Sequence, residues 1–106
     1  MAIQKVHAIV RHSYLETVEE ALVKANIRGI SVTAVKGYGD YKNFFKPDWK
    51  VPYSRIEIFT ARAQEVADII VESAHTGMAG DGIVAISPVD KLVRIRDRRE
   101  VIKGEE

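Results

Sequence analysis

The sequence predicts an α+β protein, a ferredoxin-like βαββαβ sandwich that forms one domain over residues 1–106. Two observations carry this prediction. Short runs rich in β-branched residues alternate with two amphipathic helical patterns, in the order strand, helix, strand, long loop, strand, helix, strand. Two such halves build an antiparallel four-stranded sheet with both helices on one face. A length of 106 residues, 46% of them hydrophobic, is enough for one modest core without disulfides.

The first half runs to residue 38. Residues 3–11 predict a strand that is apolar on both sides and therefore needs cover on both faces. Ser13 and Glu16 have the spacing of a capping box, which predicts a helix start, and the helix should end near Asn26. Residues 30–38 predict the second strand. The apolar stripe of the helix is Leu15, Val18, Leu22 and Ala25.

The second half follows a long connection. Residues 53–60 predict a third strand, residues 61–74 a second amphipathic helix, and residues 83–87 a fourth strand. A basic extended piece, 91–99, comes after Pro88, and the last three residues should be frayed. In this arrangement one face of the sheet has no helices, and self-association is the simplest way to cover it.

Composition excludes several classes of protein. Cysteine is absent, so neither disulfides nor thiolate metal sites are available. No run approaches the roughly 18 apolar residues of a membrane span. No signal peptide is recognisable, and we therefore expect a cytoplasmic protein without membrane insertion. The net charge of +1 and the lack of an aromatic RNA-binding strand argue against nucleic acid as a partner.

The side chains give little support for catalysis or metal binding. Nucleophilic catalysis needs a nucleophile, a base and an orienting group, and no such triad is suggested. His7, His12 and His75 are far apart in the sequence, and no HxH or HExxH pattern occurs. We therefore expect no enzyme, no catalytic residues and no resident metal. The histidines should have structural roles, with His75 in the last turn of a helix.

The segment HTGMAGDGIV, residues 75–84, is the most informative motif. It places Gly77, Gly80 and Gly82 around Asp81. It lacks the GK[ST] ending of a P-loop, and it runs from a helix into a strand instead of opening a helix. One interpretation is a tight helix-to-strand turn. The other is a nest of successive backbone N–H groups that holds phosphate oxygens.

Three charged residues bear on that choice. Arg94 and Arg96 lie two positions apart on an extended piece, so both guanidiniums would point to one side and suit a phosphate. The alternative is a solvated edge strand protected by charge. Glu57 lies between two isoleucines of the third strand, where it either faces solvent or accepts a hydrogen bond from a ligand.

The connection between the second and third strands is rich in aromatic residues. The segment at 40–50 has eleven residues and no clear hydrophobic period. Connections of this length are usually functional or mobile. The aromatics either form a small local cluster or a tip that binds a protein partner. They are Tyr41, Phe44, Phe45 and Trp49.

Taken in order, these motifs resemble the PII signalling family over about residues 3–99. VTAVKGYG at 32–39 is similar to the strand that leads into the family's long T-loop. Residues 76–82 match the T-G-x-x-G-D-G pattern of the B-loop, and residues 94–96 match the R-I-R of the C-loop. R-I-E-I at 55–58 stands between them.

The resemblance implies a homotrimer of ferredoxin-like subunits that binds an adenine nucleotide, ATP, ADP or AMP, in the clefts between subunits. It implies a signal-transduction protein without an obligatory cofactor. Such a protein regulates a partner through its T-loop, with a membrane transporter as the expected class. The T-loop would span about 39–52, the B-loop 76–82 and the C-loop about 91–100.

The same resemblance assigns binding residues by position. The phosphate cradle and its neighbour would be Thr76, Gly80, Asp81, Gly82 and Ile83. Two arginines from the neighbouring subunit, Arg94 and Arg96, would neutralise the phosphates. The ribose–phosphate side would be lined by Gly37, Tyr38 and Gly39. The adenine and its sugar would be surrounded by Ile9, Ser31, Thr33, Glu57 and Phe59.

Three positions depart from the pattern of family members that sense 2-oxoglutarate. Tyr41, Ile83 and Tyr53 stand where those members have a glutamine and two lysines. The T-loop is also shorter, and it has no match to the segment of the modifiable tyrosine. We therefore expect a divergent PII-like protein in which 2-oxoglutarate sensing and uridylylation are lost and ADP or AMP binds as well as ATP.

Two other hypotheses remain. One keeps the fold and makes the chain a metal-responsive or ligand-free trimeric interaction module, which the missing lysine at Ile83 motivates. The other is an RNA-binding ferredoxin-like domain, which the near-neutral charge disfavours.

Overall fold

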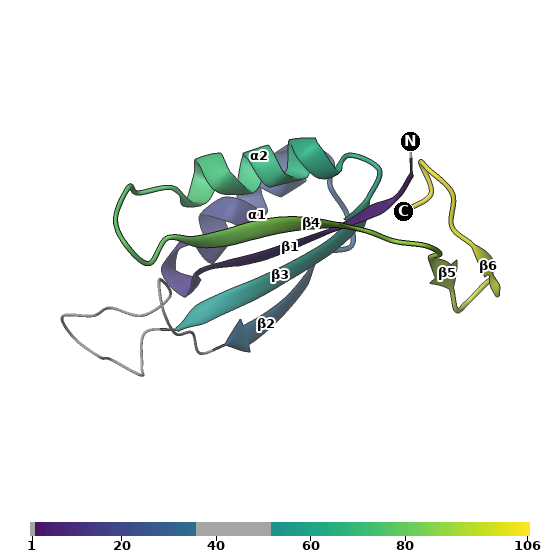
Figure 1. The fold of residues 1–106 in the computed structure, drawn as a ribbon, viewed down its shortest axis with the longest axis horizontal. Coiled ribbons are helices and arrows are strands. Elements are labelled where there is room, and N and C mark those ends of the chain that lie inside the picture. Colours follow the sequence, from purple (N-terminus) through teal and green to yellow (C-terminus); the bar gives the residue numbers. More distant parts are fainter. Residues whose placement is uncertain (1, 36–51) are drawn as a thin grey trace.

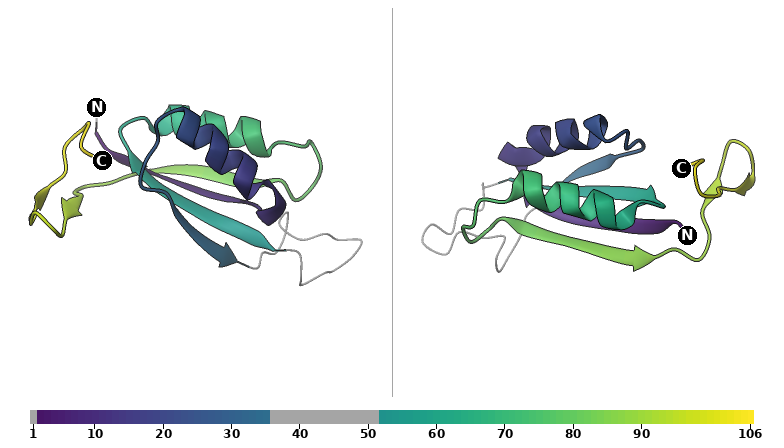
Figure 2. Two further views of the ribbon diagram at one scale, coloured as in Figure 1. Left: turned by 180° about the vertical axis from the view of Figure 1, so that it is seen from behind. Right: turned by 90° about the horizontal axis from the view of Figure 1, so that it is seen from above.

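The computed structural model describes residues 2–35 and 52–106. Within these ranges four strands form one antiparallel sheet in the order β2-β3-β1-β4, and two helices cover one face of it (Figure 1, Figure 2). The predicted α+β ferredoxin-like sandwich is confirmed. The strands are β1 (Gln4–Arg11), β2 (Ser31–Val35), β3 (Tyr53–Thr60) and β4 (Gly82–Pro88), and the helices are α1 (Leu15–Lys24) and α2 (Ala63–Ala74).

Part of the predicted site lies outside the described residues. This holds for the three residues expected at the ribose–phosphate side, Gly37, Tyr38 and Gly39. It also holds for the aromatic residues of the long loop, Tyr41, Phe44, Phe45 and Trp49. What the sequence predicts for them stays a prediction.

The core lies between the helices and one face of the sheet. Val6, Ala8 and Val10 alternate along β1 and turn their side chains to this layer, where they are buried. The helical stripes meet them, as predicted: the fully buried residues are Val18 and Leu22 on α1 and Val66 and Ile70 on α2. Each such side chain contributes roughly 1.5–3 kcal/mol on burial.

The opposite face of the sheet has no helix among the described residues (Figure 2). Here β1 presents Lys5, His7 and Ile9, which are only partly buried. The prediction of a first strand apolar on both sides was wrong, because two of these three outward side chains are polar. The alternation of side chains along β1 therefore gives one face that is apolar and buried in the core and one face that carries both polar and apolar side chains.

Helix α1 begins differently from the prediction. A 3-10 turn, η1 (His12–Tyr14), precedes it, and its N-cap residue Tyr14 makes no side-chain cap hydrogen bond. Ser13 lies inside this turn and so does not stand ahead of the helix as a capping hydroxyl. The predicted capping box with Glu16 is therefore not formed.

The end of α1 lies where the sequence places it. Asn26 has a φ of 61°, in the left-handed region. Its N–H donates to the carbonyl of Val23 at 3.0 Å, and the N–H of Ile27 donates to that of Leu22 at 3.0 Å. These are the two bonds of a Schellman motif, which satisfies the last helical carbonyls.

The basic segment after β4 is a hairpin and not one extended piece. Strands β5 (Val93–Arg94) and β6 (Arg99–Glu100) pair antiparallel, and the N–H of Arg98 donates to the carbonyl of Arg94 at 2.9 Å. Arg98 has a φ of 58°, which lets the chain reverse. The hairpin projects beyond the end of the sheet at which β1 begins (Figure 1).

The last residues are bonded to the body of the protein, so the prediction of a frayed end was wrong. The Glu106 carboxylate accepts a hydrogen bond from the N–H of Ala61 at 3.0 Å, and the Glu105 carbonyl accepts one from Arg94 at 2.7 Å. One carboxylate and one backbone carbonyl thus attach the end of the chain to the residue after β3 and to the hairpin.

Candidate functional site

The glycine loop joins α2 to β4. Gly77, Gly80 and Gly82 have φ values of 86°, 94° and 107°, in a region that side chains with a Cβ avoid. At Gly82 a Cβ would stand 1.8 Å from the carbonyl oxygen of Ile9. Only glycine fits that position, because β1 passes directly against the loop.

The Asp81 carboxylate holds the loop from inside. It accepts hydrogen bonds from the N–H of Thr76 at 2.8 Å and of Gly77 at 2.9 Å. It also accepts from the Thr76 hydroxyl and from Arg11, with which it forms an ion pair. Partial burial raises the pKa of Asp81, but these bonds outweigh burial and hold the pKa well below its ordinary value. The carboxylate is therefore ionised, and both of its oxygens accept hydrogen bonds.

These bonds leave two successive N–H groups without a partner among the described residues, one on exposed Ala79 and one on buried Gly80. Thr76 and Gly77 donate to Asp81, and Met78 donates to the Thr76 hydroxyl at 3.1 Å. No hydrogen bond joins the N–H of Ala79 or Gly80 to another described residue. Two successive unfilled N–H groups beside glycines are the donors that an anion nest needs.

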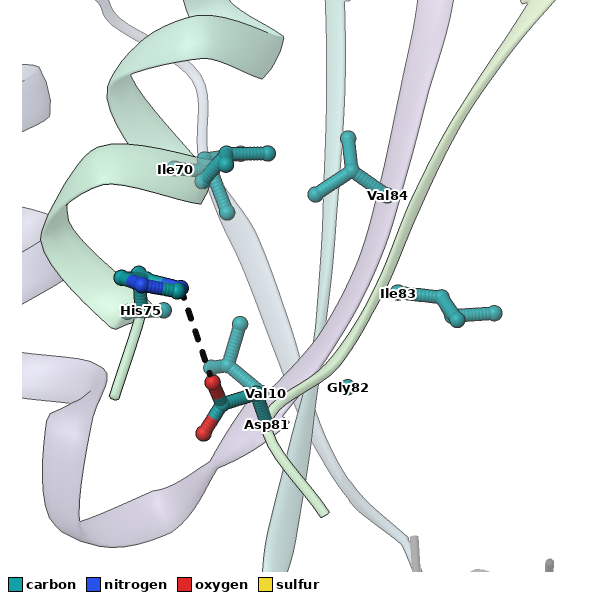
Figure 3. Close-up of a pocket in the computed structure, with 9 residues that line it drawn as sticks. Val10, Ile70, His75, Asp81, Gly82, Ile83 and Val84 are labelled. Carbon is teal, nitrogen blue, oxygen red and sulfur yellow. Dashed lines mark ion pairs between the residues drawn. The ribbon is translucent and has the colours of Figure 1, made fainter. Parts of the chain in front are cut away.

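A small pocket lies on the helix side of this loop (Figure 3). It has a volume of about 180 Å³, and Ile70 of α2 and Val84 of β4 are among its apolar walls. Two more of its lining residues form a pair, with His75 Nδ1 3.8 Å from the Asp81 carboxylate. Ligand pockets usually exceed about 300 Å³, so this one is too small for a nucleotide. His75 follows the last residue of α2 as its C-cap and is not in the last turn.

The residues predicted around the adenine share the helix-free face. In the sheet register Ser31 faces Glu57 on β3, and Thr33 lies in the next row with Ile9 and Ile83. Phe59 follows Glu57 by two residues and so points to the same side. The fold therefore places the five predicted adenine residues and Ile83 on one face. Only Ile9, Thr33 and Ile83 lie in the row next to that of Gly82, and Phe59 lies toward the other end of the sheet. Figure 3 shows the side chain of Ile83 pointing away from the pocket.

Glu57 is the acidic group of this face. Its carboxylate lies 2.9 Å from Lys5 Nζ, and both side chains are about one-third exposed, at 32% and 31%. The hydrogen bond from Lys5 lowers the pKa of Glu57. Glu57 is thus ionised and paired, on the face that the ligand hypothesis requires.

Two nitrogens on the same face lack partners among the described residues. His7 Nε2 and Arg55 Nε are buried atoms without a hydrogen bond there. Arg55 lies between Thr33 and Ile9 in the register. The sequence argument did not single it out, although its spacing of two from Glu57 places it on the same side.

The two predicted arginines lie away from the glycine loop. Arg94 donates to Asp97 at 2.8 Å, and Arg96 lies in the hairpin turn with its side chain 83% exposed. The prediction that both point to one side of a strand was wrong, because β5 ends at Arg94. The hairpin and the glycine loop stand at opposite ends of the sheet (Figure 1). One chain alone does not bring them together.

The histidines do not gather. His12 Nδ1 lies 3.0 Å from the Ser54 hydroxyl, while His7 is on the helix-free face and His75 beside Asp81. In residues 2–35 and 52–106 no group of three His, Cys, Asp or Glu side chains is placed to hold a metal. No helix of the described part is long and apolar enough to cross a membrane.

The comparisons with known proteins all point to one family. The family model described as "Nitrogen regulatory protein P-II" matches residues 3–99. A nitrogen regulatory protein P-II of Synechocystis sp. is 40% identical over 102 residues, and one of Azospirillum brasilense is 35% identical over 105 residues. A third, from Microchaete diplosiphon, is 38% identical over 102 residues. Each alignment covers 88% of this chain and 91% of the relative.

Proposed function

We propose a nucleotide-sensing role for this chain, which belongs to the nitrogen regulatory protein P-II family. Proteins of this family are signal-transduction proteins and not enzymes. In our proposal the chain binds ATP, ADP or AMP between the subunits of a homotrimer. It then regulates a protein partner, a membrane transporter in our hypothesis, through the segment at 39–52.

The observation that carries the proposal is the glycine loop. The N–H groups of Ala79 and Gly80 have no partner among the described residues, and the loop around them is held by Asp81. The helix-free face begins directly beside it at Ile83. An anion cradle next to a mixed polar and apolar surface suits a nucleotide, and P-II proteins in general bind adenine nucleotides.

The position of the hairpin supports a site between subunits. The glycine loop supplies neutral donors, and the arginine that contacts it within the described part of the chain, Arg11, is already paired with Asp81. Arg94 and Arg96 lie at the far end of the same sheet, so in this proposal they reach the phosphates of a neighbouring subunit (Figure 1). Head-to-tail contacts close into a ring when the rotation between subunits is closed, as in a homotrimer.

Ile83 supports a sensor that is insensitive to 2-oxoglutarate. Its side chain is 49% exposed on the helix-free face beside the glycine loop. An apolar side chain there offers no charge to a γ-phosphate or to a dicarboxylate. ADP and AMP therefore compete with ATP in this proposal.

The first prediction concerns thermal stability. A nucleotide present at 100 times its Kd should stabilise the protein by about 2.7 kcal/mol and raise Tm. Differential scanning fluorimetry with ATP, ADP and AMP measures the rise. Arg94→Ala should abolish it, whereas Arg98→Ala in the same hairpin turn should leave it in place. If no adenine nucleotide raises Tm in the wild-type protein, the proposal is wrong.

The alternative of a metal-responsive or ligand-free module is separated by the same assay. A metal-responsive protein would gain Tm with a divalent ion and lose that gain when His7, His12 or His75 is replaced. A ligand-free module would respond to neither nucleotides nor metals. No contact among the described residues specifically favours either alternative.

A further inference from the structure

We infer that Arg11 is the positioning residue of the glycine loop, which it shapes through Asp81 and whose internal negative charge it balances. The inference deepens the proposed function and rests on it for the identity of the ligand. Arg11 belongs to none of the motifs that the sequence indicated.

Arg11 contacts the glycine loop at three places: Thr76 at its beginning, Ala79 in its middle and Asp81 near its end. Its Nη1 donates to the Asp81 carboxylate and lies 3.4 Å from the Thr76 hydroxyl, and its Nη2 donates to the Ala79 carbonyl at 2.6 Å. These acceptors are 65 to 70 residues away in the sequence. The loop is thus fastened to the end of β1 by one side chain.

The bond to Ala79 orients the donor that the nest offers. The carbonyl of Ala79 and the N–H of Gly80 belong to one peptide unit, and in a trans peptide they point in opposite directions. When Arg11 holds the carbonyl, the N–H of Gly80 must point away from Arg11. The guanidinium therefore sets the direction of a donor that it does not touch.

Charge gives Arg11 its second role. A carboxylate inside a loop that receives phosphate would repel the ligand if it were uncompensated. Arg11 and Asp81 have side chains only 21% and 23% exposed, so solvent screens this charge weakly. Their ion pair removes the repulsion while leaving the Asp81 oxygens free to accept from Thr76 and Gly77.

A lysine at position 11 could not make the same set of hydrogen bonds. Arg11 reaches Asp81 with one terminal nitrogen and Ala79 with the other, at the fixed spacing of a planar guanidinium. A lysine ammonium offers one nitrogen, which keeps the charge but reaches these acceptors less completely. Arg11→Lys should therefore retain part of the function, and Arg11→Gln should retain little.

The test compares ATP with adenosine by calorimetry. In Arg11→Gln, affinity for ATP should fall about tenfold or more, while affinity for adenosine stays unchanged. A general folding defect would weaken both ligands alike, and that result would overturn the inference. Arg62→Gln is the matched control, because Arg62 forms an exposed ion pair with Glu65 on α2; it should change neither affinity.

A second measurement needs no ligand. Amide hydrogen exchange at Thr76 and Gly77 should accelerate in Arg11→Gln relative to wild type and to Arg62→Gln, because their acceptor loses its anchor. Unchanged exchange at both positions would overturn the positioning role. If the wild-type protein binds no adenine nucleotide, the proposed function fails, and the exchange rates still decide the role of Arg11.

Discussion

Gly82 is the residue at which side-chain size decides the geometry of the glycine loop. An alanine Cβ there would meet the Ile9 carbonyl at 1.8 Å, and the φ of 107° adds strain. We expect Gly82→Ala to lower the free energy of unfolding by about 3 kcal/mol or more. Urea denaturation measures this loss.

Gly29 provides the matched control. It also has a positive φ, 70°, but a Cβ there would meet nothing within 4 Å. Gly29→Ala should cost only the left-handed conformation, roughly 1–2 kcal/mol. Equal losses for the two variants would contradict a steric role for Gly82.

Asp81 should make the folded protein less stable as the pH is lowered. Hydrogen bonds hold its pKa in the folded state below the value of the unfolded chain. The stabilisation is thus complete above the unfolded pKa and is lost as pH falls below about 5. The difference in unfolding free energy between wild type and Asp81→Asn should shrink as pH is lowered from 6 to 3. A difference that is constant over this range would contradict it.

At the scale of elements, the Schellman end of α1 gives a local prediction. Asn26 tolerates a φ of 61° better than most residues with a Cβ. Asn26→Ala should lower the free energy of unfolding by about 1 kcal/mol, whereas Asn26→Gly should lower it by no more than a few tenths. Urea denaturation of both variants tests this, and an equal loss in both would argue against a left-handed cap.

The strands and helices of the sandwich were predictable because each has a clear period. Val6, Ala8 and Val10 alternate along β1, and α2 and β4 begin and end within two residues of their predicted bounds. The hairpin was not predictable, because its turn contains neither glycine nor proline and reverses at Arg98. The start of α1 was missed because a 3-10 turn leaves no distinct sequence pattern.

The candidate site divides in the same way. That Ser31 and Thr33 share a face follows from period two once the strand is known, whereas their assignment to the adenine, like that of Glu57, comes from the resemblance. Arg11 was missed because its acceptors are 65 to 70 residues distant, and no local pattern reports such a contact. The separation of Arg94 from the glycine loop likewise appears only when the sheet is folded.

At the scale of the whole molecule, we predict that two inactive variants complement each other. Arg94→Ala keeps an intact glycine loop, and Gly80→Asp keeps intact arginines. If each site joins the loop of one subunit to the arginine of the next, co-refolding equal amounts should restore about a quarter of the sites. Calorimetry of the mixture measures their number. A site formed within one chain would give none.

The distance between hairpin and glycine loop has a consequence for rings built from mixed subunits (Figure 1). A subunit with a damaged hairpin would still enter the ring proposed here and would deprive its neighbour of the phosphate-binding arginines. Each intact subunit would still complete one site, on the glycine loop of the neighbour that its own hairpin reaches. Mixed rings should therefore lose sites in proportion to their share of Arg94 variants, and an intact subunit can lose the use of its own loop while a damaged one keeps it.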